Sequence, residues 1–104
     1  MGTQGGTDRG VDKKVIIEAL INDEIQFTKH GFQQMIDRKL VRADLANIGR
    51  TCVAFKWQDD KKTYFVAGYD TKGKGAALSC KIEGAVVIIT VMKRHLTQKE
   101  KAGK

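Results

Sequence analysis

The stretch FTKHGFQQMIDRKLVRADLANIGR, residues 27–50, lies between a short helical segment and a long run of strand-like sequence, and it decides the fold. Four apolar residues recur in it at helical spacing: Phe32, Met35, Ile36 and Leu40. They predict a helix over residues 29–40, with Thr28 as its N-cap. Gly31 weakens this helix by about 1 kcal/mol relative to alanine, so packing must hold it.

The opposite side of the predicted helix is polar. Three residues spaced four apart form a stripe there: His30, Gln34 and Arg38. Such a stripe is ordinarily the solvent face of a helix, and a functional surface is the alternative. Residues 42–48 predict a second short helix, with Gly49 as its C-cap.

The sequence before this stretch predicts one more helix. Asp12 is the expected N-cap, and apolar residues at helical spacing predict a helix over residues 12–21. Residues 24–27 alternate between polar and apolar, which fits a short strand or an extended entry to the next helix. Residues 1–11 are expected to be a flexible lead-in or an expression tag.

From Thr51 onward the apolar pattern changes to a period of two, which predicts four strands separated by polar turns. The last strand, AVVIITVM at residues 85–92, is apolar on both faces and is expected to be central or covered on both sides. The expected fold is therefore α+β, with two or three short N-terminal helices packed on a four-stranded antiparallel β-meander. The single domain spans residues 12–93, and residues 94–104 are expected to form a basic, flexible tail.

The composition is that of a globular protein with a strong excess of positive charge. Lys and Arg number 19 against 12 Asp and Glu, which gives a net charge of +7. Such a domain attracts polyanions, so nucleic acid is the expected partner, with RNA ahead of DNA, unless the charge serves solubility alone. No apolar run approaches the roughly 20 residues that span a bilayer, and no secretory signal is present. A cytoplasmic location without membrane contact is therefore expected.

Neither a cofactor nor a metal is expected. Cys52 and Cys80 lie in apolar strand patterns and are expected to be buried free thiols, although their number also allows a disulfide. No close-spaced Cys or His pair predicts a zinc site, and a turn accounts for Asp59 and Asp60. The sequence also lacks the phosphate-loop, HExxH and GxSxG motifs.

The residues that remain for chemistry form a set that needs no metal. The 2′-hydroxyl of RNA can cleave its own strand when a base, an acid and cations assist. His30 could act as the acid or base near neutral pH, Arg38 could clamp the phosphate, and Thr90 could donate a hydrogen bond to it. The ordinary alternative is that the two helix residues face water and that Thr90 is a β-former.

Aromatic residues are interleaved with lysines in the predicted sheet, an arrangement that can stack unpaired bases. The aromatics are Trp57, Tyr64, Phe65 and Tyr69, and the lysines are Lys56, Lys61, Lys62 and Lys81. Aromatic residues in strands more often belong to the core, and that reading is favoured for Phe55, Trp57 and Phe65.

The segment FTKHGFQQMIDRKLVRADL, together with the closing VVIITVM, resembles a family of small domains that combine a His- and Arg-bearing helix pair with a β-meander. The resemblance covers residues 25–93, and it allies the chain with the RelE/ParE, barnase and EndoU-like ribonuclease toxins. It implies a RelE/ParE-like fold and places the family's histidine on His30, its second arginine on Arg38 and its strand threonine on Thr90. The chain departs from the pattern at the first arginine, which is Gln34, and at the glycine after the second, which is Lys39.

Three hypotheses follow. The first is a toxin-like, metal-independent endoribonuclease whose basic face an acidic antitoxin or immunity protein would cover. Its catalytic residues would be His30, Arg38 and Thr90, and its substrate-binding residues Gln34, Lys39, Lys56 and Lys81. The second is a non-catalytic RNA- or DNA-binding module on the same scaffold, which Gln34 in the arginine position favours. The third is a basic protein-interaction domain whose polar stripe is simply solvated.

Overall fold

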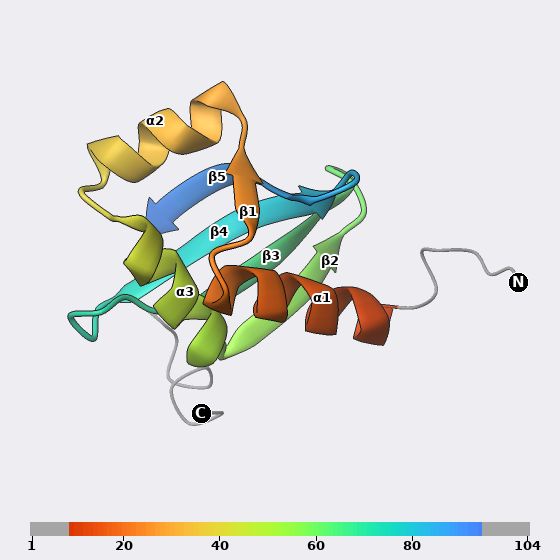
Figure 1. Cartoon of the computed structure of the whole chain (residues 1–104), viewed down its shortest axis with the longest axis horizontal. Coiled ribbons are helices and arrows are strands. Elements are labelled where there is room, and N and C mark those ends of the chain that lie inside the picture. Colours follow the sequence, from red (N-terminus) through yellow and green to blue (C-terminus); the bar gives the residue numbers. More distant parts are fainter. Residues whose placement is uncertain (1–8, 95–104) are drawn as a thin grey trace, which may run out of the picture.

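The structure is a computed structural model and describes residues 9–94. The elements in chain order are α1 (Arg9–Ile21), β1 (Ile25–Phe27), α2 (Lys29–Asp37), α3 (Arg42–Arg50), β2 (Ala54–Gln58), β3 (Thr63–Tyr69), β4 (Gly75–Ile82) and β5 (Val86–Lys93). The fold of this part of the chain is therefore α+β, as predicted (Figure 1). The expectations for residues 1–8 and 95–104 fall outside the described residues.

The first helix begins earlier than predicted. Residues 9–11, which were assigned to the lead-in, belong to α1, so Asp12 lies inside the helix and is not its N-cap. Its carboxylate instead accepts a hydrogen bond from the hydroxyl of Tyr64 on β3. The short polar side chain that suggested a cap thus joins the helix to the sheet.

The described sheet has five strands in the order β1-β5-β4-β3-β2. Strands β2 to β5 form the predicted antiparallel meander, but β1 pairs in parallel with β5, with Ile25 opposite Val86 and Phe27 opposite Ile88. The prediction of a purely antiparallel, four-stranded sheet is therefore wrong by one strand. Because β5 is apolar on both faces, it occupies an interior position, and residues 25–27 supply its second neighbour.

Helices α1 and α3 cover one face of the sheet and enclose the main core (Figure 1). The fully buried side chains at the centre of this layer are Ile16, Leu20, Leu45, Ile48, Val66, Leu78 and Ile88. Gly49 lies inside α3, where an added Cβ would come 3.0 Å from the Cβ of Leu20, and Thr51 is the C-cap. The prediction of Gly49 as C-cap is wrong because α3 continues to Arg50. The role of this glycine is to let α1 and α3 approach closely.

Helix α2 packs along the edge of β5 that β1 leaves uncovered. Thr28 is its N-cap, as predicted, and the Thr28 hydroxyl accepts a hydrogen bond from the Gly31 amide at 3.0 Å. Met35 is buried, but Phe32 and Ile36 are 47% and 50% exposed, so the predicted apolar face is wrong at these two positions. A helix on a strand edge buries a narrower stripe than a helix on a sheet face.

Candidate functional site

The face of the sheet opposite α1 and α3 carries a row of side chains that crosses four strands. Lys56 of β2 lies opposite Phe65 of β3, Phe65 opposite Ser79 of β4, and Ser79 opposite Thr90 of β5. None of the three described helices covers this row, and we call the surface around it the open face. The row brings a cation, an aromatic ring and two hydroxyls together from four consecutive strands.

The open face is hollowed. A depression of about 600 Å³ has Phe65, Ser79 and Thr90 among its lining residues, together with Lys61 and Lys81. Beside it, a second apolar cluster holds the surface in shape, with two fully buried alanines packed against larger side chains. Its members are Ala67 and Ala77, with Val53, Ala54, Phe65, Tyr69 and Met92 against them. The lining of the depression therefore combines apolar side chains with hydroxyls, three lysines and one carboxylate, that of Glu83.

The cations of the open face contact the ring of Phe65 or carboxylates at the rim. The Lys56 ammonium lies 5.7 Å from the Phe65 ring centre, and the Arg94 guanidinium lies 5.3 Å from it. Lys81 lies 3.2 Å from a Glu83 carboxylate oxygen, and both side chains are well exposed. Exposed ion pairs contribute about 0–1 kcal/mol, so these cations can exchange their partners for those of an anionic ligand.

The structure divides the seven predicted site residues into two groups. Thr90, Lys56 and Lys81 lie on the open face, and Thr90 and Lys81 both line the depression. The other four lie on α2 or directly after it: His30, Gln34, Arg38 and Lys39. None of these four is among the residues that line the depression.

On α2 the predicted polar stripe has mixed roles. His30 and Arg38 are exposed, and Arg38 is the C-cap, whose amide donates to the Gln34 carbonyl at 2.9 Å. Lys39 is exposed in a left-handed backbone conformation, with φ of 59°, and reverses the chain after the helix. His30 and Arg38 are exposed, as both the solvent-face and the functional interpretation of the stripe require, and their predicted catalytic roles stay predictions.

Gln34 binds the backbone edge of β5 through its side chain. Its Oε1 accepts a hydrogen bond from the Val91 amide of β5 at 3.1 Å, at a point on the edge that β1 does not reach. Arginine has no acceptor atom and could not replace it there. This hydrogen bond gives Gln34 a structural role, and its predicted role in substrate binding stays a prediction.

Gln34→Leu is expected to lower the free energy of unfolding by about 1–3 kcal/mol, because the Val91 amide loses its acceptor while it remains partly buried. The matched control is Gln33→Leu, which removes only an exposed hydrogen bond from the Gln33 amide to Asp37. That change is expected to stay within about 0.5 kcal/mol. Urea denaturation of both variants tests this, and equal effects would mean that Gln34 does not hold the edge.

The sequence predicts no binding role for Ser79 or Arg94 of the open face, and for Phe65 it favours a core position over base stacking. Arg94 falls in the predicted tail, residues 94–104. The alternation of strand residues carries part of the signal, since it puts Phe65 on the side opposite Tyr64. It does not show which side the helices leave uncovered.

Both cysteines are free, as predicted. Burial raises the pKa of the Cys80 thiol to about 12, and burial also raises that of Cys52, against the opposing charge of Lys13. Neither is therefore a reactive thiolate at neutral pH. Within residues 9–94 no group of His, Cys, Asp or Glu is arranged to hold a metal ion, and no helix is long and apolar enough to span a membrane.

Comparisons with protein-family models, with curated proteins and with solved structures find no match to this chain. The resemblance to the ribonuclease-toxin families therefore rests on the residues of α2 and β5 quoted above. The RelE/ParE-like fold stays a prediction, and the open face must be interpreted from its own geometry.

Proposed function

We propose that this protein binds single-stranded RNA across the open face of its sheet. The observation that carries this proposal is the row Lys56–Phe65–Ser79–Thr90, which places a cation, an aromatic ring and two hydroxyls side by side along a depression that three lysines help to line. Sheet surfaces with such side chains bind unpaired strands by stacking bases and neutralising phosphates.

The Phe65 ring is the stacking element of this proposal. It is partly exposed, and its two cationic neighbours, Lys56 and Arg94, sit on long, flexible side chains. When a base takes their place on the ring, both cations remain close enough to pair with the flanking phosphates. Stacking of one base on an aromatic side chain contributes about 1–3 kcal/mol.

Two features favour unpaired RNA over other nucleic acids. Bases in a duplex are stacked on each other and cannot lie on Phe65, so a duplex would use the cations alone. The hydroxyls of Ser79 and Thr90 lie beside the ring in the same row, where they can exchange hydrogen bonds with a ribose 2′-hydroxyl. DNA lacks that group and is expected to bind less tightly.

Fluorescence anisotropy with a labelled RNA of about ten nucleotides, within the site sizes common for single-strand binding, tests the proposal. Phe65→Leu is expected to weaken binding about 5- to 100-fold without changing its salt dependence, because it removes a stacked ring and no charge. Lys81→Ala is expected to make the slope of log affinity against log salt shallower by about 0.7, because one phosphate contact is lost.

The matched control is Lys14→Ala, which removes the same charge from an exposed position on α1, over the other face. If Lys14→Ala and Lys81→Ala reduce binding equally, net charge and not the open face attracts the RNA. Equal binding of a DNA strand would remove the role of the hydroxyls. Absence of any binding at low salt would overturn the proposal and leave a basic protein-interaction domain.

A second candidate function is cleavage of the bound strand, in the manner of a toxin-like, metal-independent endoribonuclease. The packing of α2 on β5 favours it, because the helix that carries His30 and Arg38 runs beside the strand that carries Thr90. The same RNA incubated in EDTA with wild type and His30→Ala separates the two functions. Cleavage by the wild type alone, with cyclic-phosphate ends, supports the nuclease, and intact RNA supports binding only. An acidic antitoxin or immunity protein would compete with RNA for the basic face.

A further inference from the structure

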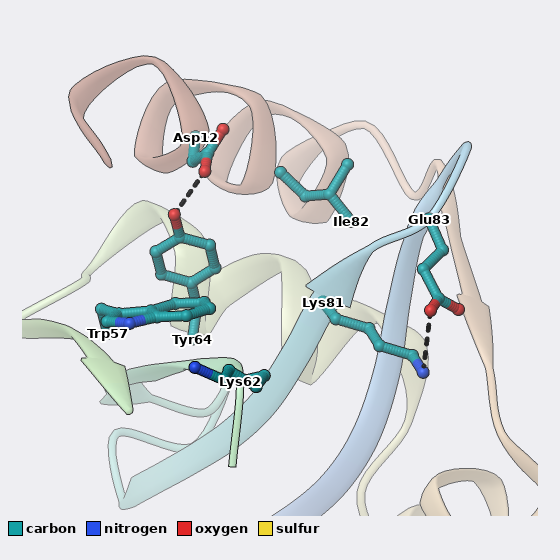
Figure 2. A pocket seen from close by; sticks show the side chains of 7 residues that line it. All are labelled: Asp12, Trp57, Lys62, Tyr64, Lys81, Ile82 and Glu83. Atoms are coloured by element: carbon teal, nitrogen blue, oxygen red, sulfur yellow. Dashed lines mark hydrogen bonds and ion pairs between the residues drawn. The ribbon is translucent and has the colours of Figure 1, made fainter. Parts of the chain in front are cut away.

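A second, smaller hollow lies on the helix-covered side of the sheet. It has a volume of about 240 Å³ and lies between α1, the β2–β3 pair and the end of β4 (Figure 2). Sites for drug-sized ligands usually enclose about 300–1,000 Å³, so this hollow suits one small planar group. Trp57 and Tyr64 stand on one side of it, and Ile82 stands across from them.

The aromatic wall of the hollow is fixed in place. The ring centres of Trp57 and Tyr64 are 4.9 Å apart with an interplanar angle of 60°, and the Tyr64 hydroxyl donates to the Asp12 carboxylate. The Trp57 indole N–H donates to Asp59 at 3.2 Å. Tyr64 is buried, whereas Trp57 is partly exposed and can contact a ligand. A rigid aromatic side chain binds a flat ring with little loss of conformational entropy.

The hollow shares three lining residues with the depression on the open face. Lys62, Lys81 and Glu83 line both of them, at the end of the sheet where β4 leads into β5. Lys62 pairs with Asp59 at 3.3 Å, and this ion pair is more exposed than that of Lys81, so Lys62 too can exchange its partner for an anionic ligand. An RNA strand whose phosphates pair with Lys62 and Lys81 would therefore run from the open face around the end of the sheet.

The charges in the hollow decide which part of a nucleotide it can accept. The carboxylates of Asp12 and Glu83 belong to its lining and would repel a phosphate. They accept hydrogen bonds from amino groups, and the rest of the wall is aromatic or aliphatic. Lys62 and Lys81 line both the hollow and the depression. We infer that the hollow receives one unstacked nucleobase of the RNA strand, while the neighbouring phosphates stay with Lys62 and Lys81. This inference rests on the proposed function.

Trp57 makes the inference testable, because it is the single tryptophan of the sequence. A labelled adenosine-containing RNA of about ten nucleotides is titrated while anisotropy reports total binding and tryptophan emission reports the hollow. We expect the emission to be quenched with the same midpoint as the anisotropy change. Ile82→Glu, which places a charge opposite Trp57, is expected to abolish the quenching and to weaken binding about 5- to 100-fold.

Val15→Glu is the matched control, since it adds the same charge at an exposed apolar position of α1 that does not line the hollow. It is expected to leave the quenching intact. An anisotropy change with unaltered emission, and with equal affinity for wild type and Ile82→Glu, would overturn this inference and leave the open-face site standing. No anisotropy change would overturn both.

Discussion

Gly31→Ala is expected to lower the free energy of unfolding by about 3 kcal/mol, although the substitution exchanges glycine for the best helix former. An alanine Cβ at this position would lie 2.4 Å from the carbonyl oxygen of Ile88 and 3.1 Å from the carbonyl carbon of Ile89. Both are backbone atoms of β5 and cannot move aside as a side chain can. Helix α2 would have to shift away from the strand edge, which would weaken its contacts with β5.

Helix propensity alone predicts the opposite sign, because alanine in a helix interior is more favourable than glycine by about 1 kcal/mol. Gly10→Ala in α1 is the matched control, since an added Cβ there meets no atom within 4 Å. It is expected to be neutral or to stabilise the protein by up to about 1 kcal/mol. Urea denaturation followed by circular dichroism measures both. A Gly31→Ala protein as stable as wild type would mean that α2 does not lie against β5 as described.

The local signals around residues 27–50 predicted the existence of α2 and its Thr28 cap, because a cap and an apolar period depend on neighbouring residues only. They predicted the buried side of the helix only in part, since Met35 is buried but Phe32 and Ile36 are exposed. That choice depends on packing against a strand edge, where Gly31 and Gln34 face the sheet and Phe32 and Ile36 are left exposed. The close approach of β5, which is distant in the sequence, also explains why glycine is required at position 31.

The candidate site was predictable only in part, for a related reason. Alternation within each strand predicts that the side chains of Phe65 and Tyr64 point to opposite faces of the sheet, and likewise those of Ser79 and Cys80. Whether Lys56, Phe65 and Thr90 share one surface depends on the register of four strands, and β4 and β5 shift their register between Ser79 and Cys80. No local pattern encodes that irregularity, so the convergence of these residues becomes visible only in the folded chain.

Asp44→Ala is expected to lower the free energy of unfolding by about 3 kcal/mol, because it removes a buried acceptor of three hydrogen bonds. Asp44 is 6% exposed and lies in the first turn of α3. Its Oδ1 accepts from the amide and the hydroxyl of Thr71, at 2.9 and 2.6 Å, and its Oδ2 accepts from the Val41 amide at 2.8 Å. The carboxylate thus ties the start of α3 to the turn between β3 and β4. Asp37→Ala, at an exposed carboxylate, is the control and is expected to stay within about 0.5 kcal/mol.

The pH dependence of stability distinguishes the contribution of the Asp44 charge from that of its hydrogen-bond geometry. Burial by itself raises the pKa of Asp44, but the hydrogen bonds from Thr71 and Val41 and the nearby Lys72 outweigh burial, so the pKa is lowered. The unfolded chain therefore binds this proton at a higher pH than the folded chain does. The stabilisation is complete above the ordinary aspartate pKa of about 3.9 and is lost as the pH falls through the lowered value.

Asp44→Asn keeps one acceptor oxygen and mimics the protonated side chain, so its difference in stability from wild type should be largest near neutral pH. That difference should stay constant from about pH 7 to about pH 4 and narrow below the ordinary aspartate pKa of about 3.9, which urea denaturation at a series of pH values down to about 2 measures. A constant difference would show that the charge contributes nothing and that the lost acceptor geometry accounts for the whole effect. A narrowing difference would show that the ionised carboxylate itself holds α3 to the turn after β3.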